Sequence, residues 1–353
     1  MFRFTLFALL VGLIFPTALQ GQHPESADAV VEGVDFRVYD ARGRSKSFAD
    51  ILAALDDADA VLVGESHDDV VGHGVEAQIL VRAAQRFGAM DDEVETERTV
   101  VLSLEMFERD VQYVLDEYLA GLITEDQFKA SARPWDRYDT DYRSMVEFAR
   151  GHGLAVVAAN APRRYVNRVT RLGAESLAEL PSEAKRFLPP LPYPGASEEY
   201  TAQWNALMME MMAEMRAAGA PAEEAGAEEA EEVSAEEAEE AEDTGEQAPA
   251  NHGMGYALES QALWDAAMGH AVASALAENP DGLVVHYAGS FHVEKFTGTP
   301  ERVADYRPGT RILTVVLKPA QDINGWDEDE HENLGDFVVL TQAPPEDENH
   351  PAG

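Results

Sequence analysis

Short, almost wholly apolar segments alternate with helix-like segments along this chain, and no other feature restricts its fold as strongly. These apolar segments are too short for buried helices, and they lack the polar–apolar alternation of a half-exposed strand. They therefore indicate strands covered on both faces, and we predict an α/β fold with a mostly parallel central sheet flanked by helices, with a helical subdomain. A shorter alternating segment at 34–40 is predicted to be an edge strand. The predicted buried strands are residues 58–63, 99–107, 154–160, 282–290 and 310–317.

Ionisable or amide side chains follow four of these predicted strands at their carboxyl ends. Parallel strands bring those ends to one edge of the sheet, where α/β proteins bind ligands, so we expect the side chains to converge. Imidazole and carboxylate groups could there bind divalent zinc, manganese or iron, or could act without metal as a general acid–base set. The spacing does not separate these alternatives. The candidate metal-ligating or catalytic residues are Glu65, His67, Glu105 and His292, and Asn160 and Arg163 follow the remaining strand.

Other polar residues lie in apolar, helix-like surroundings. His73 is six residues after His67, and we expect it to begin a helix rather than to join the site. His270 and His286 are expected in the core. Asp265 lies on an otherwise apolar helix and needs a partner, for which Arg163 or Arg164 is the expected candidate.

Aromatic and methionine side chains gather between residues 193 and 215. Methionine adapts to irregular apolar surfaces, so this segment could wall a flat apolar cofactor such as haem, although ordinary helix core is the simpler interpretation. The residues are Tyr193, Tyr200, Trp204, Met208, Met209, Met211, Met212 and Met215.

The composition excludes several classes of protein. There is no cysteine, so disulfides, thiolate metal sites and cysteine nucleophiles are absent. The formal net charge is −40, from 66 acidic and 26 basic residues, and such a surface repels nucleic acid. Only five of the basic residues are lysines, and abundant acid with little lysine is typical of halophile-like proteins.

The chain ends and one internal segment differ in character from the rest. Arg3 precedes an apolar segment at 4–15, which predicts a signal peptide over 1–21 and an exported, periplasmic or secreted protein. No cysteine stands near the cleavage region for a lipid anchor, and no later apolar stretch is long enough for a transmembrane span. We predict one domain over 22–341, interrupted by an acidic low-complexity insert at 219–250, and a flexible tail at 342–353.

Five segments together resemble the ChaN-like haem-binding uptake family, within the wider Tiki, TraB and erythromycin-esterase superfamily. Each is short, but their order makes the set specific. They are VLVGESHDDVVGH (61–73), LSLEMFERD (102–110), NAPRRYVNRV (160–169), ESQALWDAAMGHAV (259–272) and GSFHVEKFTGTPERV (289–303).

The resemblance implies a haem-binding protein of the cell envelope, associated with iron uptake, in which a tyrosine on the iron holds haem at a homodimer interface. Other branches of the superfamily are hydrolases that use the GExH segment, which leaves a hydrolase as the alternative. The missing lipidation cysteine and the acidic insert depart from the family pattern. The cofactor-binding candidates are Tyr193, Tyr200, Tyr165, Tyr256, Asn160, Arg163, Gln261 and Asp265.

Overall fold

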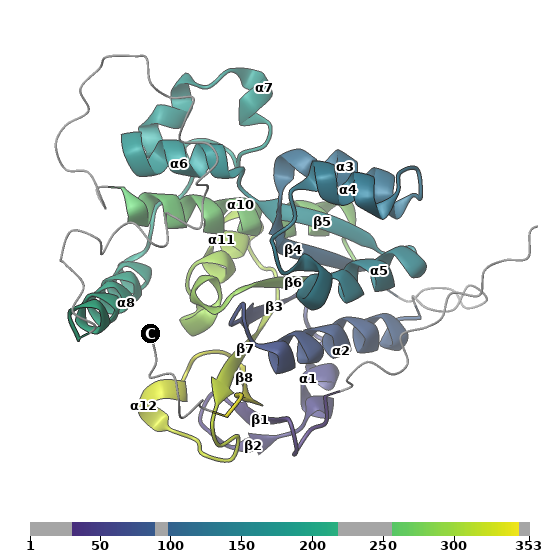
Figure 1. The fold of residues 1–353 in the computed structure, drawn as a ribbon, viewed down its shortest axis with the longest axis vertical. Coiled ribbons are helices and arrows are strands. Elements are labelled where there is room, and N and C mark those ends of the chain that lie inside the picture. Colours follow the sequence, from purple (N-terminus) through teal and green to yellow (C-terminus); the bar gives the residue numbers. More distant parts are fainter. Residues whose placement is uncertain (1–29, 89–97, 218–255, 346–353) are drawn as a thin grey trace, which may run out of the picture.

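The computed structural model describes residues 30–88, 98–217 and 256–345 (Figure 1). The predicted signal peptide, the acidic insert and most of the tail lie outside these residues. The described strands form one eight-stranded sheet in the order β2-β1-β8-β7-β3-β6-β4-β5. The strands are β1 (Phe36–Asp40), β2 (Ser45–Lys46), β3 (Ala60–Glu65), β4 (Val100–Glu108), β5 (Ala155–Asn160), β6 (Leu283–Gly289), β7 (Ile312–Ala320) and β8 (Phe337–Gln342).

The sheet is parallel from β8 to β5, and β1 pairs antiparallel with both of its neighbours, β2 and β8. The predicted α/β class with a mostly parallel sheet is confirmed. The prediction of an edge strand at 34–40 is wrong, because the short β2 pairs outside β1. The sequence analysis also missed β8, which lies between β1 and β7 and supplies the parallel partner of β7.

Helices cover both faces of the sheet (Figure 1). Alternate residues of β3 face opposite layers, so Val61 and Val63 pack in the larger apolar cluster and Ala60 and Leu62 in the smaller one. The larger cluster includes α1 (Phe48–Ala54), α2 (Val70–Arg86), α3 (Gln112–Leu119), α4 (Glu125–Ala132) and α5 (Arg143–Gly151). The smaller includes α10 (Ala257–Glu278) and α11 (Thr299–Tyr306).

A third apolar cluster joins further helices to the outer side of α10. Val166 and Leu177 pack there with Leu263, and this layer corresponds to the expected helical subdomain. Its elements are α6 (Arg163–Leu172) and η3 (Ala174–Glu179), and the short α7 (Ser182–Lys185) follows them in the chain. The remaining elements are η1 (Arg109–Val111), the π-helix η2 (Tyr138–Tyr142), α8 (Glu198–Ala217), η4 (Ser290–His292), η5 (Glu294–Phe296) and α12 (Glu328–His331).

Side-chain caps mark where two of these helices begin. Ser47 accepts a hydrogen bond from the Asp50 amide at the start of α1, and Asp50 bonds back to the Ser47 amide. Thr124 and Gln127 form the same reciprocal arrangement at the start of α4. Each pair satisfies two amides that the first helical turn leaves without partners. Within the described residues, every helix falls short of the length and apolar character that crossing a membrane requires.

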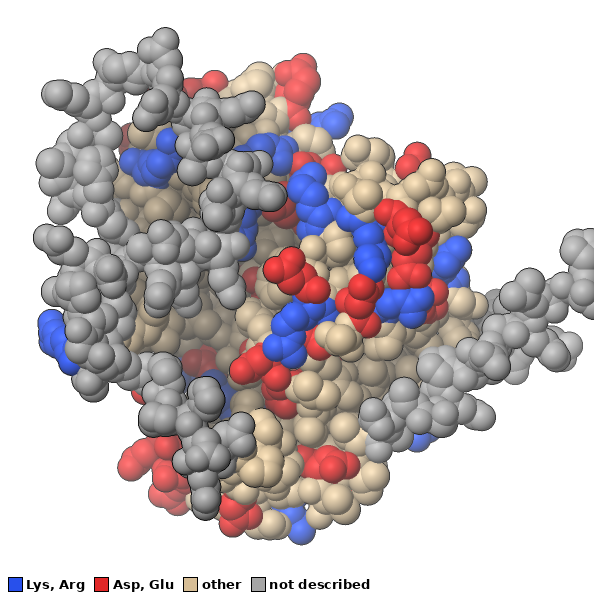
Figure 2. Space-filling view, in the orientation of Figure 1, with Lys and Arg blue, Asp and Glu red and all other residues tan. Residues whose placement is uncertain are grey.

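Many basic side chains on the surface around α4 and α5 lie against acidic ones (Figure 2). Lys129 pairs with Asp139, and Arg137 pairs with Asp141. Exposed pairs of this kind contribute little to stability, but Asp141 is buried, so Arg137 balances a charge that lies inside the protein.

Candidate functional site

The carboxyl ends of β3, β4 and β6 bring the predicted residues together. Glu65 at the end of β3 lies opposite Gly289 at the end of β6. The Gly289 amide donates a 2.7 Å hydrogen bond to Oε2 of Glu105 on β4. A Cβ on Gly289 would lie 3.0 Å from the His67 ring, so the absence of a side chain there lets His67 approach the sheet edge.

Glu65 is the centre of the first half of the site. Its Oε1 accepts a hydrogen bond from the Tyr142 hydroxyl at 2.7 Å and lies 2.8 Å from Nδ1 of His67, and its Oε2 lies 2.9 Å from Nε2 of His73. Burial alone would raise the pKa of Glu65, but its contacts with His67 and His73 hold it down to about 2. Glu65 is therefore ionised at neutral pH despite being 1% exposed.

The neighbouring groups respond to that charge. Burial would lower the pKa of His67, but the hydrogen bond to Glu65 and the charge of Glu105 raise it above its ordinary value. Burial and the Glu65 charge raise the pKa of Tyr142 far above its usual range, so Tyr142 stays a hydrogen-bond donor. Burial and the same charge raise the pKa of Glu76 well above its ordinary value.

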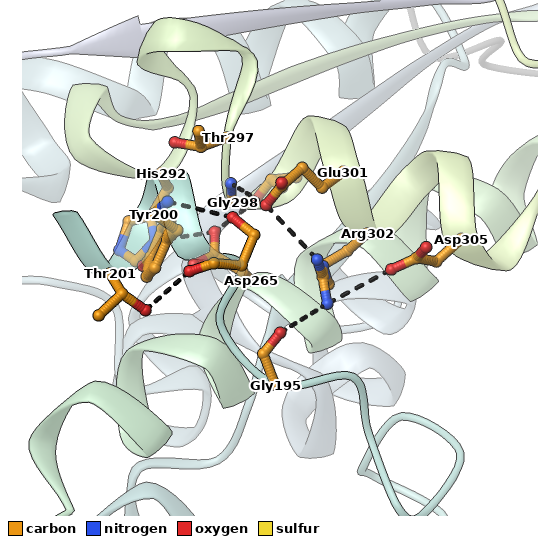
Figure 3. A network of polar contacts seen from close by, with 12 residues as sticks. Gly195, Tyr200, Thr201, Asp265, His292, Thr297, Gly298, Glu301, Arg302 and Asp305 are labelled. Atoms are coloured by element: carbon orange, nitrogen blue, oxygen red, sulfur yellow. Dashed lines mark hydrogen bonds and ion pairs between the residues drawn. The ribbon is translucent and has the colours of Figure 1, made fainter. Parts of the chain in front are cut away.

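Asp265 and His292 form the second half (Figure 3). Oδ1 of Asp265 lies 3.0 Å from Nδ1 of His292 and accepts a 2.9 Å hydrogen bond from the Thr299 hydroxyl. Gly298 has a φ of +65°, and a Cβ there would lie 2.7 Å from Oδ1 of Asp265. Tyr200 is buried beside this pair, and its burial and the Asp265 charge raise its pKa well above the ordinary value.

Glu105 links the two halves. Its Oε1 lies 3.8 Å from Nε2 of His292, and its charge acts on His67 from the other side. The expectation that Glu65, His67, Glu105 and His292 meet at one sheet edge therefore agrees with this geometry. Two histidines, each held through Nδ1 by a carboxylate, flank a third carboxylate. Such a set can hold a divalent cation or exchange protons with a bound molecule.

Two expectations about partners are wrong. Asp265 does not pair with Arg163 or Arg164, because α11 and η4 bring Thr299 and His292 to it, and Arg164 instead pairs with Asp110. His73 does not begin the helix, since α2 starts at Val70. It lies one turn into α2, and its buried ring contacts Glu65 and lies edge-on to Tyr142.

The expected core histidines are in part confirmed. His286 is fully buried, lies 2.9 Å from the Ser103 hydroxyl, and has its pKa lowered to about 3 by burial. His270 is half-buried, and Nδ1 lies 3.2 Å from the Arg109 guanidinium, so burial and the Arg109 charge lower its pKa to about 4. Both are neutral at pH 7.

The four tyrosine candidates lie in different places. Tyr200 is 1% exposed and packs against Phe291, with ring centroids 5.0 Å apart. Tyr165 lies under the Arg164 guanidinium, and Tyr256 is exposed at the start of α10. Tyr193 is half-buried, and its hydroxyl donates a 2.8 Å hydrogen bond to the Glu259 carbonyl.

The remaining cofactor candidates lie away from the carboxylate–histidine cluster or are occupied locally. Asn160 accepts a 2.8 Å hydrogen bond from the next amide, that of Ala161. Arg163 is half-exposed at the start of α6. Oε1 of Gln261 is buried and has no hydrogen-bond partner among the described residues.

A groove of about 1350 Å³ lies beside Tyr193, and we call it the Tyr193 groove. Its wall combines apolar, cationic and acidic side chains, and the apolar and cationic ones suit a flat apolar ligand that carries acidic groups. The lining includes the apolar Leu172, Leu177, Leu188 and Leu191, the phenol of Tyr193, the basic Arg109, Lys185 and Arg186, and the acidic Glu175 and Glu179.

Sequence reasoning missed Glu76, Asp141 and Tyr142 as parts of the site. Glu76 could have been found, because it lies between Val75 and Ile79 on the apolar face of α2, where an acidic residue needs a partner. Asp141 and Tyr142 belong to the π-helix η2 and gave no periodic signal.

The fold of this chain resembles that of a solved protein structure. The chain is similar to ChaN of Campylobacter jejuni, whose structure is described as showing cofacial heme binding, with 18% identity, a TM-score of 0.56, and 89% of this chain and 100% of that chain covered. The type III effector HopBA1 matches with 10% identity and a TM-score of 0.40, covering 83% of this chain and 92% of that chain. A variant of erythromycin esterase EreC in its open conformation matches with 12% identity and a TM-score of 0.38, covering 87% of this chain and 83% of that chain.

No curated protein matches the chain by sequence. The sequence profile described as "Haem-binding uptake, Tiki superfamily, ChaN" matches residues 51–303, which is well over half of the chain and contains all five segments noted in the sequence. This protein therefore belongs to the ChaN haem-binding uptake family of the Tiki superfamily.

Proposed function

We propose that this protein binds haem in the Tyr193 groove. The observation that carries this proposal is the combination of a phenol, apolar walls and cations in one groove. Leu172, Leu177 and Leu188 would contact the porphyrin, and Lys185 and Arg186 would pair with its propionates. The related Campylobacter protein is described as binding haem cofacially, and its fold is the same.

Tyr193 is the candidate axial ligand. Burial and the Glu259 charge raise the pKa of Tyr193 above its ordinary value, and its hydroxyl now donates to a backbone carbonyl. The positive charge of ferric iron, when haem is bound, favours the phenolate. Tyr200 fits this role less well, because its hydroxyl is buried beside Asp265.

A haemin titration of the full chain tests the proposal. We expect a saturable Soret shift, a loss of at least tenfold in affinity and an altered visible spectrum in Tyr193→Phe, and no change in Tyr200→Phe. Both variants lose only a hydroxyl. A wild-type chain without a saturable Soret shift would refute haem binding, and an unchanged spectrum in Tyr193→Phe would refute the assignment of the ligand.

Export and uptake are part of the same proposal. The signal-like segment at 1–21 supports secretion to the periplasm or outside the cell, and a homodimer would allow two haems to lie face to face. Fractionation of the native host and a sedimentation measurement with and without haemin test these two points.

A hydrolase is the second candidate, because the two carboxylate–histidine pairs are built as acid–base groups. Glu65 holds Nδ1 of His67, which leaves Nε2 to exchange a proton, and the His67 side chain is 48% exposed. Asp265 holds His292 in the same manner on the other side of Glu105. The test is hydrolysis of a chromogenic ester by the wild type. This activity would be established if His67→Ala and His292→Ala each lose the hydrolysis but still bind haem.

A further inference from the structure

A buried group of three side chains lies beneath His67 and is not part of the Tyr193 groove. Glu65, His73 and Glu76 each offer one ligand atom, and these atoms lie within 4.8 Å of one another. Glu65 and Glu76 are 1% and 0% exposed, and His73 is 6% exposed. We call this group the Glu76 triad.

Glu76 is the feature that ordinary packing does not explain. Among the described residues, neither of its carboxyl oxygens has a conventional hydrogen-bond donor, and the polar group beside it is the carboxyl of Glu65. Burying a carboxyl group without partners costs several kcal/mol, so such residues are normally hydrogen-bonded or coordinate a metal. Oε2 of Glu65 is likewise without a well-formed hydrogen bond, although Nε2 of His73 lies 2.9 Å away.

The local structure directs these atoms to one point. His73 and Glu76 are three residues apart on α2, so they share one face of the helix. Tyr142 and His67 both engage Oε1 of Glu65, and this leaves Oε2 for the triad. The set offers one nitrogen and at least two oxygens, which suits manganese, iron or zinc.

A buried carboxylate lies behind His73. Oδ1 of Asp141 lies 3.8 Å from Nδ1 of His73, on the side of the ring opposite Glu65. Arg137 holds the other oxygen of Asp141 at 2.6 Å. At 3.8 Å the two groups are not hydrogen-bonded, so the Asp141 carboxylate acts on His73 as a nearby negative charge.

We propose that Oε2 of Glu65, Nε2 of His73 and a carboxyl oxygen of Glu76 bind one divalent transition-metal ion. This site differs from the set considered in the sequence, because His67, Glu105 and His292 are not ligands in it. It is also separate from the proposed haem site, so either can exist without the other. The ion supplies positive charge beside two buried carboxyl groups, and it anchors α2 to the end of β3.

Metal binding by the full chain tests this proposal. Protein dialysed against a chelator is equilibrated with Mn²⁺ or Zn²⁺ alone, desalted and analysed for metal, and affinities are measured by competition with a chromogenic chelator. We expect one tightly bound ion per chain in the wild type. Glu76→Gln and His73→Gln should each weaken binding at least tenfold, and Asp141→Asn should weaken it by a smaller factor.

Glu105→Gln is the matched control, since it makes the same substitution at another buried carboxyl group of this sheet edge but lies outside the triad. It should retain the ion. Weak binding to other carboxylates is common to all variants and cancels in the comparison. The absence of a tight ion in the wild type would overturn the proposal, as would wild-type affinity in Glu76→Gln or a loss confined to Glu105→Gln.

Two further measurements distinguish a lost metal site from a misfolded variant and from a failure of the haem proposal. Co²⁺ bound to the wild type should give visible absorption bands that Zn²⁺ and Mn²⁺ displace, which requires no variant. Glu76→Gln should titrate with haemin as the wild type does, so a failed haem proposal and a failed metal proposal give different results.

Discussion

Oδ1 of Asp265 on α10 lies 3.0 Å from Nδ1 of His292, and this contact ties the helix layer on one face of the sheet to the segment that follows β6. The same oxygen also accepts the Thr299 hydroxyl at the start of α11. One buried carboxylate therefore joins three elements and sets the direction of His292 toward Glu105.

Asp265→Asn should destabilise the fold through these contacts. The amide oxygen of asparagine can still accept a hydrogen bond, but the negative charge that His292 and Thr299 face is lost. We therefore expect the free energy of unfolding to fall by about 1–3 kcal/mol. Urea denaturation measures this loss. Asp305→Asn breaks the more exposed pair with Arg302 and should cost less than about 1 kcal/mol. Equal losses in the two variants would show that the Asp265 contacts add nothing.

Two glycines at the sheet edge should respond differently to alanine. A Cβ at Gly64 would lie 2.9 Å from the backbone Cα of Ser290, which cannot move easily, so we expect Gly64→Ala to cost about 1–3 kcal/mol. A Cβ at Gly289 would meet the ring of His67 at 3.0 Å, and this half-exposed ring can rotate away.

Gly289→Ala should therefore spare stability but displace His67 from Glu65. The pKa of His67, which the Glu65 hydrogen bond and the Glu105 charge raise, should fall toward its ordinary value. Thermal unfolding and an NMR titration of the histidines measure the two effects. A large loss of stability in Gly289→Ala together with an unchanged His67 pKa would contradict the placement of this ring.

His286 should make the fold sensitive to acid. Burial lowers its pKa in the folded protein to about 3, whereas the unfolded chain has the ordinary value near 6.5. Below pH ~6.5 the unfolded state binds a proton that the folded state does not, so the stability contributed by neutral His286 is lost as the pH falls toward about 3. The expected slope is about 1 kcal/mol per pH unit.

His286→Asn is the variant that isolates this contribution. Asparagine can replace the contact with the Ser103 hydroxyl but does not titrate. Denaturation at pH 7, 6, 5 and 4 should show that the difference in the free energy of unfolding between wild type and variant becomes smaller as the pH falls. Parallel curves over this range would mean that His286 is protonated in both states or in neither.

Arg98 should be hard to replace even by lysine. Its guanidinium donates to the carbonyls of Leu55, Ala58 and Gly282 at 2.8–3.0 Å, and so joins the segments before β3 and β6. Arg98→Ala should cost about 2 kcal/mol, and Arg98→Lys should recover less than half, because an ammonium cannot reach several carbonyls at once.

Arg311→Ala provides the comparison for Arg98. Arg311 is 59% exposed and pairs with Asp59, so its loss should cost less than about 1 kcal/mol in the same denaturation measurement. Full recovery in Arg98→Lys would show that charge, rather than the fork of donors, accounts for the effect.

Local patterns in the sequence were sufficient for the buried strands and for the edge where the site lies. Apolar segments such as 58–63 can only be covered strands, and parallel strands must place their carboxyl ends together, so Glu65, Glu105 and His292 were expected as neighbours. The strand β8 was not predicted, although its apolar residues at 337–340 form the same kind of segment as 58–63.

Amino-acid sequence alone thus determined the fold class, the family and which residues approach one another along the sheet. Only the tertiary structure decided that Asp265 pairs with His292 rather than with an arginine, that His73 and Glu76 face Glu65, and that Tyr193 rather than Tyr200 lines the groove of about 1350 Å³. The reason is physical. Hydropathy shows which face of a helix is buried, but a buried polar group takes its partner from whichever element packs against that face, and this depends on how α2, α10 and α11 cross the sheet.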